Sequence, residues 1–377
     1  MKSNYKLGEL IKQRREKYDG TDLPICGVTK DGFIPPKQKD ADTSLYNMFY
    51  LKDFVFNPAR MELNSIVFND KYEKAMCSSL YEVFYVERTD IIMPEYLALI
   101  VKQDRFVRFC EFQGSGSARE YCRVANISEL PIEVPTLDEQ LRIVNHYSVI
   151  NKRITLIRHI NENLEASART LFKSYFVDFE PFNGSQPNTW RELTVDDIAS
   201  EVICGKTPPT ADPENYGTYM PFITIPDMHG SVYTTSTERF LSPKGVTTQT
   251  NKTLPINSIC VSCIASVGLV SLTAEPSQTN QQINSIVCKD DISPYYVYIK
   301  MSTLSDYLKQ LGAGGSTTIN VNKTLFGQIP ILCPDKTTMA DFHRKVAPLF
   351  DEIRSNQYEM QQLESLKDIL LTMISSS

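Results

Sequence analysis

The sequence predicts an α+β fold in which one unit, a mixed globular domain followed by a long helix, occurs twice. Three observations support this prediction. The 377 residues suit two domains of ordinary size, a heptad pattern of apolar residues occurs in two places, and short motifs recur at a fixed distance. The expected organisation is a first domain at 1–135, a central long helix at 136–180, a linker at 181–186, a second domain at 187–335 and a C-terminal long helix at 336–377.

Composition and the lack of targeting signals indicate which class of protein this is. Hydrophobic residues make up 42% of the chain and charged residues 22%, which is typical of soluble globular proteins. No apolar run is long enough for a membrane span, and the N-terminus MKSNYKLGELIKQRREKY lacks the apolar core of a signal peptide. We therefore expect a cytoplasmic protein with no membrane partner, whose nine cysteines are buried thiols rather than a disulfide framework.

The charge of the chain is unevenly distributed. A formal net charge of -6 argues against a simple nucleic-acid coat, but binding depends on where the positive charge lies. Residues 241–274 and 307–334 each contain two lysines and no acidic residue. Residues 101–123 contain five basic residues against three acidic ones. These three segments are the places where contact with a nucleic acid is most favoured.

The stretch LPIEVPTLDEQLRIV, residues 130–144, marks the end of the first domain. Pro131 and Pro135 stop the preceding structure, because proline lacks a backbone donor and fixes its own φ angle. Thr136 can cap the helix that follows, and two acidic residues in its first turn suit the helix dipole. The helix is predicted to run from about 137 to 177 and to end before the linker FEPFNGSQPN.

A heptad seam runs along this helix. Its positions are spaced alternately four and three residues apart, which is typical of a coiled coil rather than of a surface helix in a globular domain. They are Ile143, Tyr147, Ile150, Ile154, Ile157, Asn161, Leu164, Ala168 and Leu171. The seam therefore predicts a helical partner.

The same pattern recurs in the second half of the chain. LPIEVP at residue 130 aligns with IPILCP at residue 329, and at that offset GSGS aligns with AGGS. The second seam comprises Phe342, Val346, Leu349, Ile353, Asn356, Met360 and Leu363. A polar seam residue also recurs, Asn161 in the first seam and Asn356 in the second, and such a residue fixes the register and the partner. The domain interiors between these markers differ.

Each long helix is predicted to pair with the other, because the tether between them raises the effective concentration. With a whole domain between them, the helices can lie antiparallel, as a coiled coil about a pseudo-twofold axis with the two domains at opposite ends. Two alternatives remain: each helix belongs to the core of its own domain, or it forms a zipper between two copies of the chain.

Two stretches, LPIEVPTLDEQLRIV and LEASARTLFKSYFVDFEPF, resemble the central region of the specificity (S) subunits of type I restriction-modification enzymes. In the second domain, GKTPPT (205–210), ITIPDM (223–228), LPINSICVSCIASVGLVS (254–271) and SQTNQQINSIV (277–287) resemble the target-recognition domains of that family. The resemblance is close over residues 110–182 and 187–377. It is looser over residues 1–109, which contain no GKTP-like turn and no TNQQ-like segment.

This resemblance implies a non-catalytic DNA reader. In this family each recognition domain binds one half of a bipartite site in double-stranded DNA, and the paired helices set the spacer between the halves. The helices also dock two modification (M) subunits, and restriction (R) subunits join the full complex. The alternative is a coiled-coil scaffold that binds only proteins, which accounts for the seam but leaves the basic segments unexplained.

An enzyme would need motifs that this sequence lacks. An adenine methyltransferase holds its flipped base with an Asn/Asp-Pro-Pro-aromatic segment, and only FNPAR (56–60) and ADPEN (211–215) come near that pattern. LGAGGS (311–316) does not match a phosphate-binding loop. The four histidines and the CxxC pair of Cys260 and Cys263 offer no metal spacing. We therefore expect no catalytic residue, no metal and no cofactor.

Candidate DNA contacts in the second domain lie in two of these motifs. Lys206 and Thr207 of GKTPPT can reach a phosphate or a base edge, or the turn can simply connect two strands. Gln281 and Gln282 carry side-chain amides, which can read adenine in the major groove. Their alternative role is structural, as buried amides paired with the backbone.

A polar loop led by glycine is expected in both copies just before the long helix. Its candidate residues are Ser316, Thr317, Asn320 and Lys323 in the second copy and Ser117, Arg119 and Arg123 in the first. Polar and cationic side chains suit phosphate contact, and a shared structural turn is the alternative. Arg105 and Arg108 are three residues apart, so they can share a helical face, where they either contact DNA or remain solvated.

Overall fold

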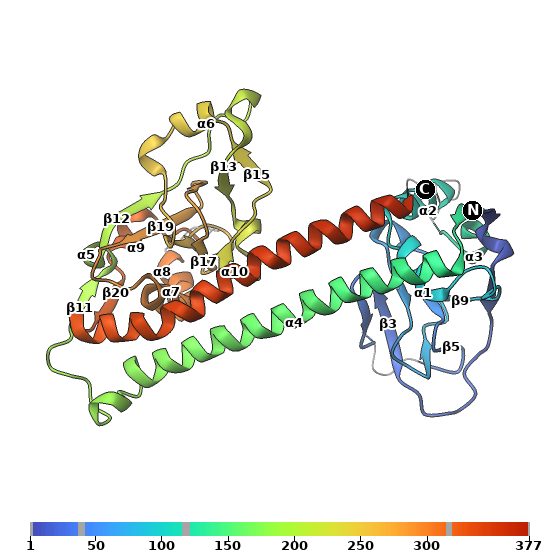
Figure 1. Cartoon of the computed structure of the whole chain (residues 1–377). Helices are drawn as coiled ribbons and strands as arrows, with labels where there is room; N and C mark the ends of the chain where they lie inside the picture. Colours follow the sequence, from blue (N-terminus) through green and yellow to red (C-terminus); the bar gives the residue numbers. More distant parts are fainter. Residues whose placement is uncertain (1–2, 37–41, 115–120, 314–318, 376–377) are drawn as a thin grey trace. The chain divides into compact units, whose positions relative to one another are not determined.

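The computed structural model describes residues 3–36, 42–114, 121–313 and 319–375 (Figure 1). The chain forms two compact units, residues 1–153 with 364–377 and residues 154–363. We call the globular part of the first unit, up to Val134, the first domain, and the globular part of the second unit, residues 190–333, the second domain. No helix in the described ranges is both long enough and apolar enough to cross a membrane.

The first domain contains two four-stranded sheets. The antiparallel sheet has the order β2 (Ile11–Arg14), β9 (Glu82–Val86), β6 (Phe54–Phe56) and β7 (Ile66–Phe68). The second sheet has the order β4 (Gly32–Ile34), β3 (Ile25–Thr29), β8 (Lys74–Cys77) and β5 (Asn47–Tyr50), and its β3 and β8 run parallel. One cluster of buried side chains includes residues of the antiparallel sheet, and a second joins residues of both sheets, such as Phe49 of β5 and Val83 of β9.

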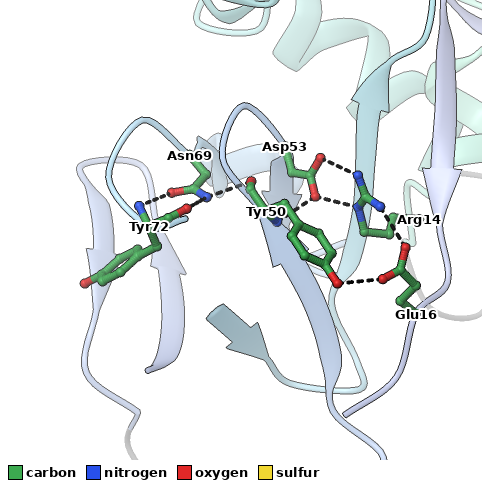
Figure 2. A network of polar contacts seen from close by, with 6 residues as sticks. All are labelled: Arg14, Glu16, Tyr50, Asp53, Asn69 and Tyr72. Atoms are coloured by element: carbon green, nitrogen blue, oxygen red, sulfur yellow. Dashed lines mark hydrogen bonds and ion pairs between the residues drawn. The ribbon is translucent and has the colours of Figure 1, made fainter. Parts of the chain in front are cut away.

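A polar network joins these two sheets (Figure 2). Arg14 of β2 binds the buried Asp53 through two nitrogens, at 2.6 and 3.1 Å, and its guanidinium lies 4.6 Å from the ring centre of Tyr50. Glu16 accepts hydrogen bonds from both Arg14 and Tyr50, each at 2.8 Å. Asn69 Nδ2 donates to Tyr50 O at 2.7 Å, and Asn69 Oδ1 accepts Tyr72 N at 2.9 Å. Since Asp53 is almost fully buried, this ion pair fixes the turn between β5 and β6.

The remaining elements of the first domain lie around the antiparallel sheet. Strands β1 (Ser3–Lys6) and β10 (Pro131–Val134) pair antiparallel. The helices are η1 (Leu7–Glu9), η2 (Met61–Leu63), α1 (Pro94–Ile100), α2 (Asp104–Gly114) and α3 (Val124–Ile127). Proline at the first position of α1 suits a helix start, because its missing N–H would have no partner there.

The second domain is built on a five-stranded sheet in the order β12 (Ala199–Cys204), β19 (Ile283–Cys288), β16 (Ile259–Ser262), β17 (Val270–Thr273) and β14 (Tyr233–Thr234). A three-stranded sheet has the order β15 (Arg239–Leu241), β13 (Tyr216–Ile223) and β18 (Gln278–Thr279), and β11 (Arg191–Thr194) pairs with β20 (Pro330–Cys333). The helix η3 (Glu180–Phe182) precedes this domain, and the helices within it are α5 (Val195–Ile198), η4 (Pro213–Asn215), η5 (Ile225–Met228), α6 (Pro243–Thr247), η6 (Thr250–Lys252), α7 (Pro294–Ser302), α8 (Ser305–Gly312) and α9 (Lys323–Gly327).

The two domains share a strand topology. The order β2-β9-β6-β7 in the first corresponds to β12-β19-β16-β17 in the second, and the parallel pair β3–β8 corresponds to β13–β18. The strand pairs that open and close each domain, β1–β10 and β11–β20, also correspond. Leu7 N donates to Leu130 O in the first domain, and Val195 N donates to Ile329 O in the second. The repeat therefore extends into the interiors, although their sequences do not align.

The long helices are α4 (Leu137–Phe176) and α10 (Lys336–Ser375). The predicted start of α4 is confirmed, and Thr136 Oγ1 accepts the backbone N–H of Glu139 at 3.4 Å. The seam positions of α4 are buried or half-buried throughout. In α10 the buried face also includes Phe350, one residue beyond the predicted seam position Leu349.

The two long helices contact each other within each unit. In the second unit, Asn356 Nδ2 donates to Asn161 Oδ1 at 2.9 Å, and Tyr175 OH donates to Asp341 Oδ2 at 2.7 Å. Residue numbers rise along α4 where they fall along α10, so the helices run in opposite directions here. In the first unit, the Lys367 ammonium lies 5.8 Å from the ring centre of Tyr147.

Candidate nucleic-acid interface

The GKTPPT turn packs directly on the TNQQ segment of the second domain. Gly205 N donates to Ile283 O at 3.1 Å, and Lys206 N donates to Thr279 O at 3.0 Å. Position 205 has no room for a side chain, because a Cβ atom there would lie 2.2 Å from Asn280 O. Only glycine at this position allows the GKTPPT turn and the TNQQ segment to pack at this distance.

Four predicted DNA contacts are brought together by this packing: Lys206, Thr207, Gln281 and Gln282. Thr207 Oγ1 donates to Gln281 Oε1 at 2.6 Å. This bond uses the side-chain oxygen of the exposed Gln281 and not its amide nitrogen. Gln282 is half-buried, and its Oε1 accepts from Asn280 Nδ2 at 3.0 Å. Neither glutamine is fully buried: Gln281 is exposed and bonds Thr207, whereas Gln282 is half-buried and bonds Asn280.

The segment that precedes α9 adjoins the same surface. Cys263 N donates to Gln282 O at 2.8 Å and Val321 N donates to Cys263 O at 2.9 Å, so three segments are joined by backbone bonds. Asn320 pairs with Ile264 in an isolated bridge. The exposed Lys323 therefore lies near the turn and the TNQQ segment, although the sequence places it some 40 residues from Gln282.

The predicted loop before each long helix differs from the structure. Lys323 is the first residue of α9, because Asn322 Oδ1 caps that helix by accepting Leu325 N at 3.0 Å. Arg123 is the N-cap residue of α3. Strands β20 and β10 then intervene before the long helices. Ser117, Arg119, Ser316 and Thr317 lie outside the described residues.

Tertiary contacts engage both lysines of the acid-free segment 241–274, Lys244 through carboxylates and Lys252 through a backbone carbonyl. Lys244 binds Asp212 at 2.9 Å and Glu214 at 2.7 Å, and these carboxylates raise the pKa of Lys244 to about 12. Lys252 donates to Cys204 O at 2.5 Å. Lys206 and Lys323, in contrast, have no carboxylate within ion-pair distance among the described residues, which leaves their charges available to an anionic ligand.

The arginines predicted in the first domain are more strongly engaged. Arg108 lies 3.8 Å from Asp104 across one turn of α2, and Arg105 donates to Pro131 O at 3.4 Å. Arg123 binds Glu82 at 3.1 Å, and the second carboxylate oxygen of Glu82 accepts Val124 N at 2.7 Å. Arg123 thus helps to hold the start of α3, which is a structural role that the sequence does not reveal.

A groove in the first domain was not predicted. It has a volume of about 360 Å³. Its lining residues are Ile25, Cys26, Gly27, Val28, Thr29, Ile34, Pro35, Pro36, Tyr46, Asn57, Arg60, Ser78, Leu80 and Tyr81. We call it the first-domain groove. The sequence signal for this groove is FNPAR, which supplies Asn57 and Arg60. By its pattern alone FNPAR resembles only an incomplete base-pocket motif.

The groups considered for catalysis have structural contacts. The ADPEN stretch forms η4, where the Asp212 side chain caps Glu214 N at 3.1 Å. His343 Nδ1 lies 2.9 Å from Ser293 Oγ. Burial raises the pKa of the Cys260 thiol to about 12, and that of Cys263 to about 11. Within the described ranges, no group of three or more His, Cys, Asp or Glu residues could hold a metal ion.

Two mixed domains of one topology, each followed by a long helix, define the class of protein. Residues 3–166 and 187–364 each match the family described as type I restriction modification DNA specificity domain. The chain therefore belongs to the family of type I restriction-modification specificity subunits, the DNA-recognition components of these systems, which are not their catalytic subunits.

Individual relatives agree with this membership. The HindI specificity subunit of Haemophilus influenzae is 32% identical over 351 residues, covering 75% of this chain and 76% of that protein. The MjaIX specificity subunit of Methanocaldococcus jannaschii is 24% identical over 301 residues, covering 75% and 68%. The crystal structure of an S subunit from M. genitalium matches with a TM-score of 0.64 at 15% identity, over 99% of this chain and 96% of that one. This last likeness concerns the fold.

Proposed function

We propose that this chain reads a bipartite site in double-stranded DNA, with each domain contacting one half. The observation that carries the proposal is the shared topology of two domains whose interiors differ in sequence. Two domains that bind different half-sites can share one backbone topology, but they need different surface residues. Base edges in the major groove carry the sequence information, whereas phosphate contacts fix position.

In the second domain, Gln281 and Gln282 are the proposed base readers. The free amide nitrogen of Gln281 can donate to adenine N7, or the side chain can rotate away from Thr207 to form the bidentate pair. Lys206, Thr207, Asn320 and Lys323 surround them and contact the phosphate backbone. Arg105 and Arg108 on α2 are proposed as weaker backbone contacts of the first domain, since each already has one partner.

The long helices are proposed to form an antiparallel coiled coil about a pseudo-twofold axis and thereby to set the spacer between the half-sites. The Asn161–Asn356 hydrogen bond supports this role, because a polar pair inside an apolar seam specifies one register. Each seam contains one asparagine, so each helix offers the same type of residue to the other.

The helices are also proposed to dock two M subunits, with R subunits completing the assembly. Large apolar side chains on the outer faces of α4 and α10 support a protein contact. Those exposed within the first unit are Leu137, Leu141, Val149, Leu366, Ile369 and Met373. A coiled-coil scaffold without DNA readout would share this surface, but it would not need Lys206 and Lys323, which have no carboxylate partner among the described residues.

The test is DNA binding by the complex of this chain with its M subunits, measured as a function of salt. Affinity for one bipartite sequence should exceed affinity for random DNA. It should fall steeply as salt rises, because lysine and arginine side chains that contact phosphates displace the counterions of the DNA. This chain alone should transfer no labelled methyl groups to DNA. A complex that binds all DNA sequences equally would favour the scaffold function instead.

A further inference from the structure

The turn that carries Gln281 and Gln282 has a structural counterpart in the first domain. In the parallel strand pairs, Cys77 lies opposite Cys26 as Thr279 lies opposite Ile223. Cys77 therefore occupies the place of Thr279. The residues that follow, Ser78, Ser79 and Leu80, take the places of Asn280, Gln281 and Gln282.

Hydrogen bonds confirm this correspondence. Tyr81 N donates to Ser78 O at 3.0 Å, as Ile283 N donates to Asn280 O at 3.3 Å. The Ser78 hydroxyl accepts Leu80 N at 3.3 Å, where the Asn280 side-chain oxygen accepts Gln282 N at 3.0 Å. The two turns have the same bonding pattern but present different side chains.

A second segment corresponds in the same way. Cys122 N donates to Pro58 O at 2.9 Å, and Val321 N donates to Cys263 O at 2.9 Å. Pro58 therefore takes the place of Cys263. Arg60 follows two residues later and lines the first-domain groove together with Leu80 of the first-domain turn.

The first-domain groove between these segments suits a DNA base. Its lining contains no aspartate or glutamate, although the chain has a net charge of -6. Arg60 is exposed, and among the described residues no acceptor lies within bonding distance of its guanidinium. Leu80 is 77% exposed, so it presents an apolar side chain at the groove beside Arg60.

We propose that the first-domain groove is the base-reading site of the first domain, in which Arg60 binds a guanine in the major groove and Leu80 contacts the methyl group of a thymine. The guanidinium forms two hydrogen bonds with the N7 and O6 atoms of guanine, and an apolar side chain suits the thymine methyl. This inference rests on the proposed function and adds the chemistry of the first half-site, which differs from the adenine readout of the second domain.

A base contact explains the groove better than a phosphate contact does. A phosphate needs only donors and positive charge, and neither an exposed leucine nor a wall that includes Ile25, Val28 and Ile34 supplies them. Arginine beside an apolar side chain fits the edge of a base pair step, which offers acceptors and a methyl group together.

The experiment is selection of DNA from a random library by the complete complex with its M subunits. Wild type, Arg60→Ala and the matched control Arg88→Ala are compared, since Arg88 is an exposed arginine paired with Asp90 and does not line the groove. Arg60→Ala should reduce discrimination for guanine at one position of the first half-site on the order of 10- to 100-fold. The second half-site should be recovered unchanged, which also shows that the variant is folded and assembled.

The thymine contact is tested with synthetic sites in which deoxyuridine replaces each thymine of the first half-site, because deoxyuridine lacks only the methyl group. One replacement should weaken binding by the wild type and have no effect on Leu80→Ala. If Arg60→Ala keeps the guanine preference, or weakens all sequences equally, the inference is wrong while a wild-type bipartite site still supports the proposed function. If wild type selects no bipartite site, both are wrong.

Discussion

Substituting Gly205 with alanine should separate the GKTPPT turn from the TNQQ segment and thereby abolish reading of the second half-site. The added Cβ would lie 2.2 Å from Asn280 O and 2.3 Å from Thr279 O, and both are backbone atoms that cannot rotate away. The turn must therefore shift, and the bonds from Gly205 N to Ile283 O and from Lys206 N to Thr279 O must lengthen or break.

The expected cost follows from these contacts. Two backbone hydrogen bonds contribute about 1 kcal/mol each, and overpacking of a tight contact costs about 1–3 kcal/mol, so the free energy of unfolding should fall by about 3–5 kcal/mol. For a domain of this size, that corresponds to a decrease in melting temperature on the order of 6–20 °C. The loss should be confined to the second domain.

The assay uses the fluorescence of Trp190, the sole tryptophan of the chain, which is buried in the core of the second unit. Its urea unfolding curve reports on that unit. Gly217→Ala is the matched control, because its added Cβ would come no closer than 3.3 Å to Ser242 and should change stability by less than about 1 kcal/mol. Equal unfolding and equal DNA selection for both variants would refute the proposed packing of the turn as the basis of the site.

Three further predictions concern the other parts of the molecule. Lys323→Ala should weaken binding of the complex to cognate and random DNA alike and reduce its salt dependence, whereas a loss confined to the cognate sequence would make Lys323 a base reader. Insertion of one heptad after Asn161 and one after Asn356 should lengthen the selected spacer by about three base pairs, since seven residues add roughly 10 Å of helix. An unchanged spacer would exclude the helices as its determinant. Asp53→Ala leaves Arg14 without its buried partner, and it should destabilise the first domain by about 3–5 kcal/mol, measured by amide hydrogen exchange of β2 and β6. Asp90→Ala, which removes an exposed partner of Arg88, should have little effect there.

The long helices were predictable because their signals are local. The alternation of apolar residues from Ile143 to Leu171, the cap at Thr136 and the acidic first turn all lie within one stretch of sequence. The same reasoning found Asn161 and Asn356, which the structure joins by a hydrogen bond.

The domain interiors were not predictable in this way, because their order depends on distant pairings. Cys26 and Cys77 are register partners in parallel strands, and nothing near either residue indicates the other. Charge was misread for the same reason: Lys244 lies in an acid-free segment, yet Asp212 and Glu214 reach it from thirty residues away. The groove containing Arg60 and Leu80 was not predictable either, because its lining residues come from stretches far apart in the sequence, among them 25–36, 57–60 and 78–81.

The most direct test of the central claim, that two domains of one frame read two different half-sites, is exchange of residues 187–335 for another recognition domain of this family. DNA methylation is then mapped across the genome in cells that contain the M subunits and either the original or the exchanged chain. The account predicts a bipartite methylated motif in which the exchange replaces one half and leaves the other half and the spacer unchanged. A continuous motif, or a change in both halves at once, would contradict it.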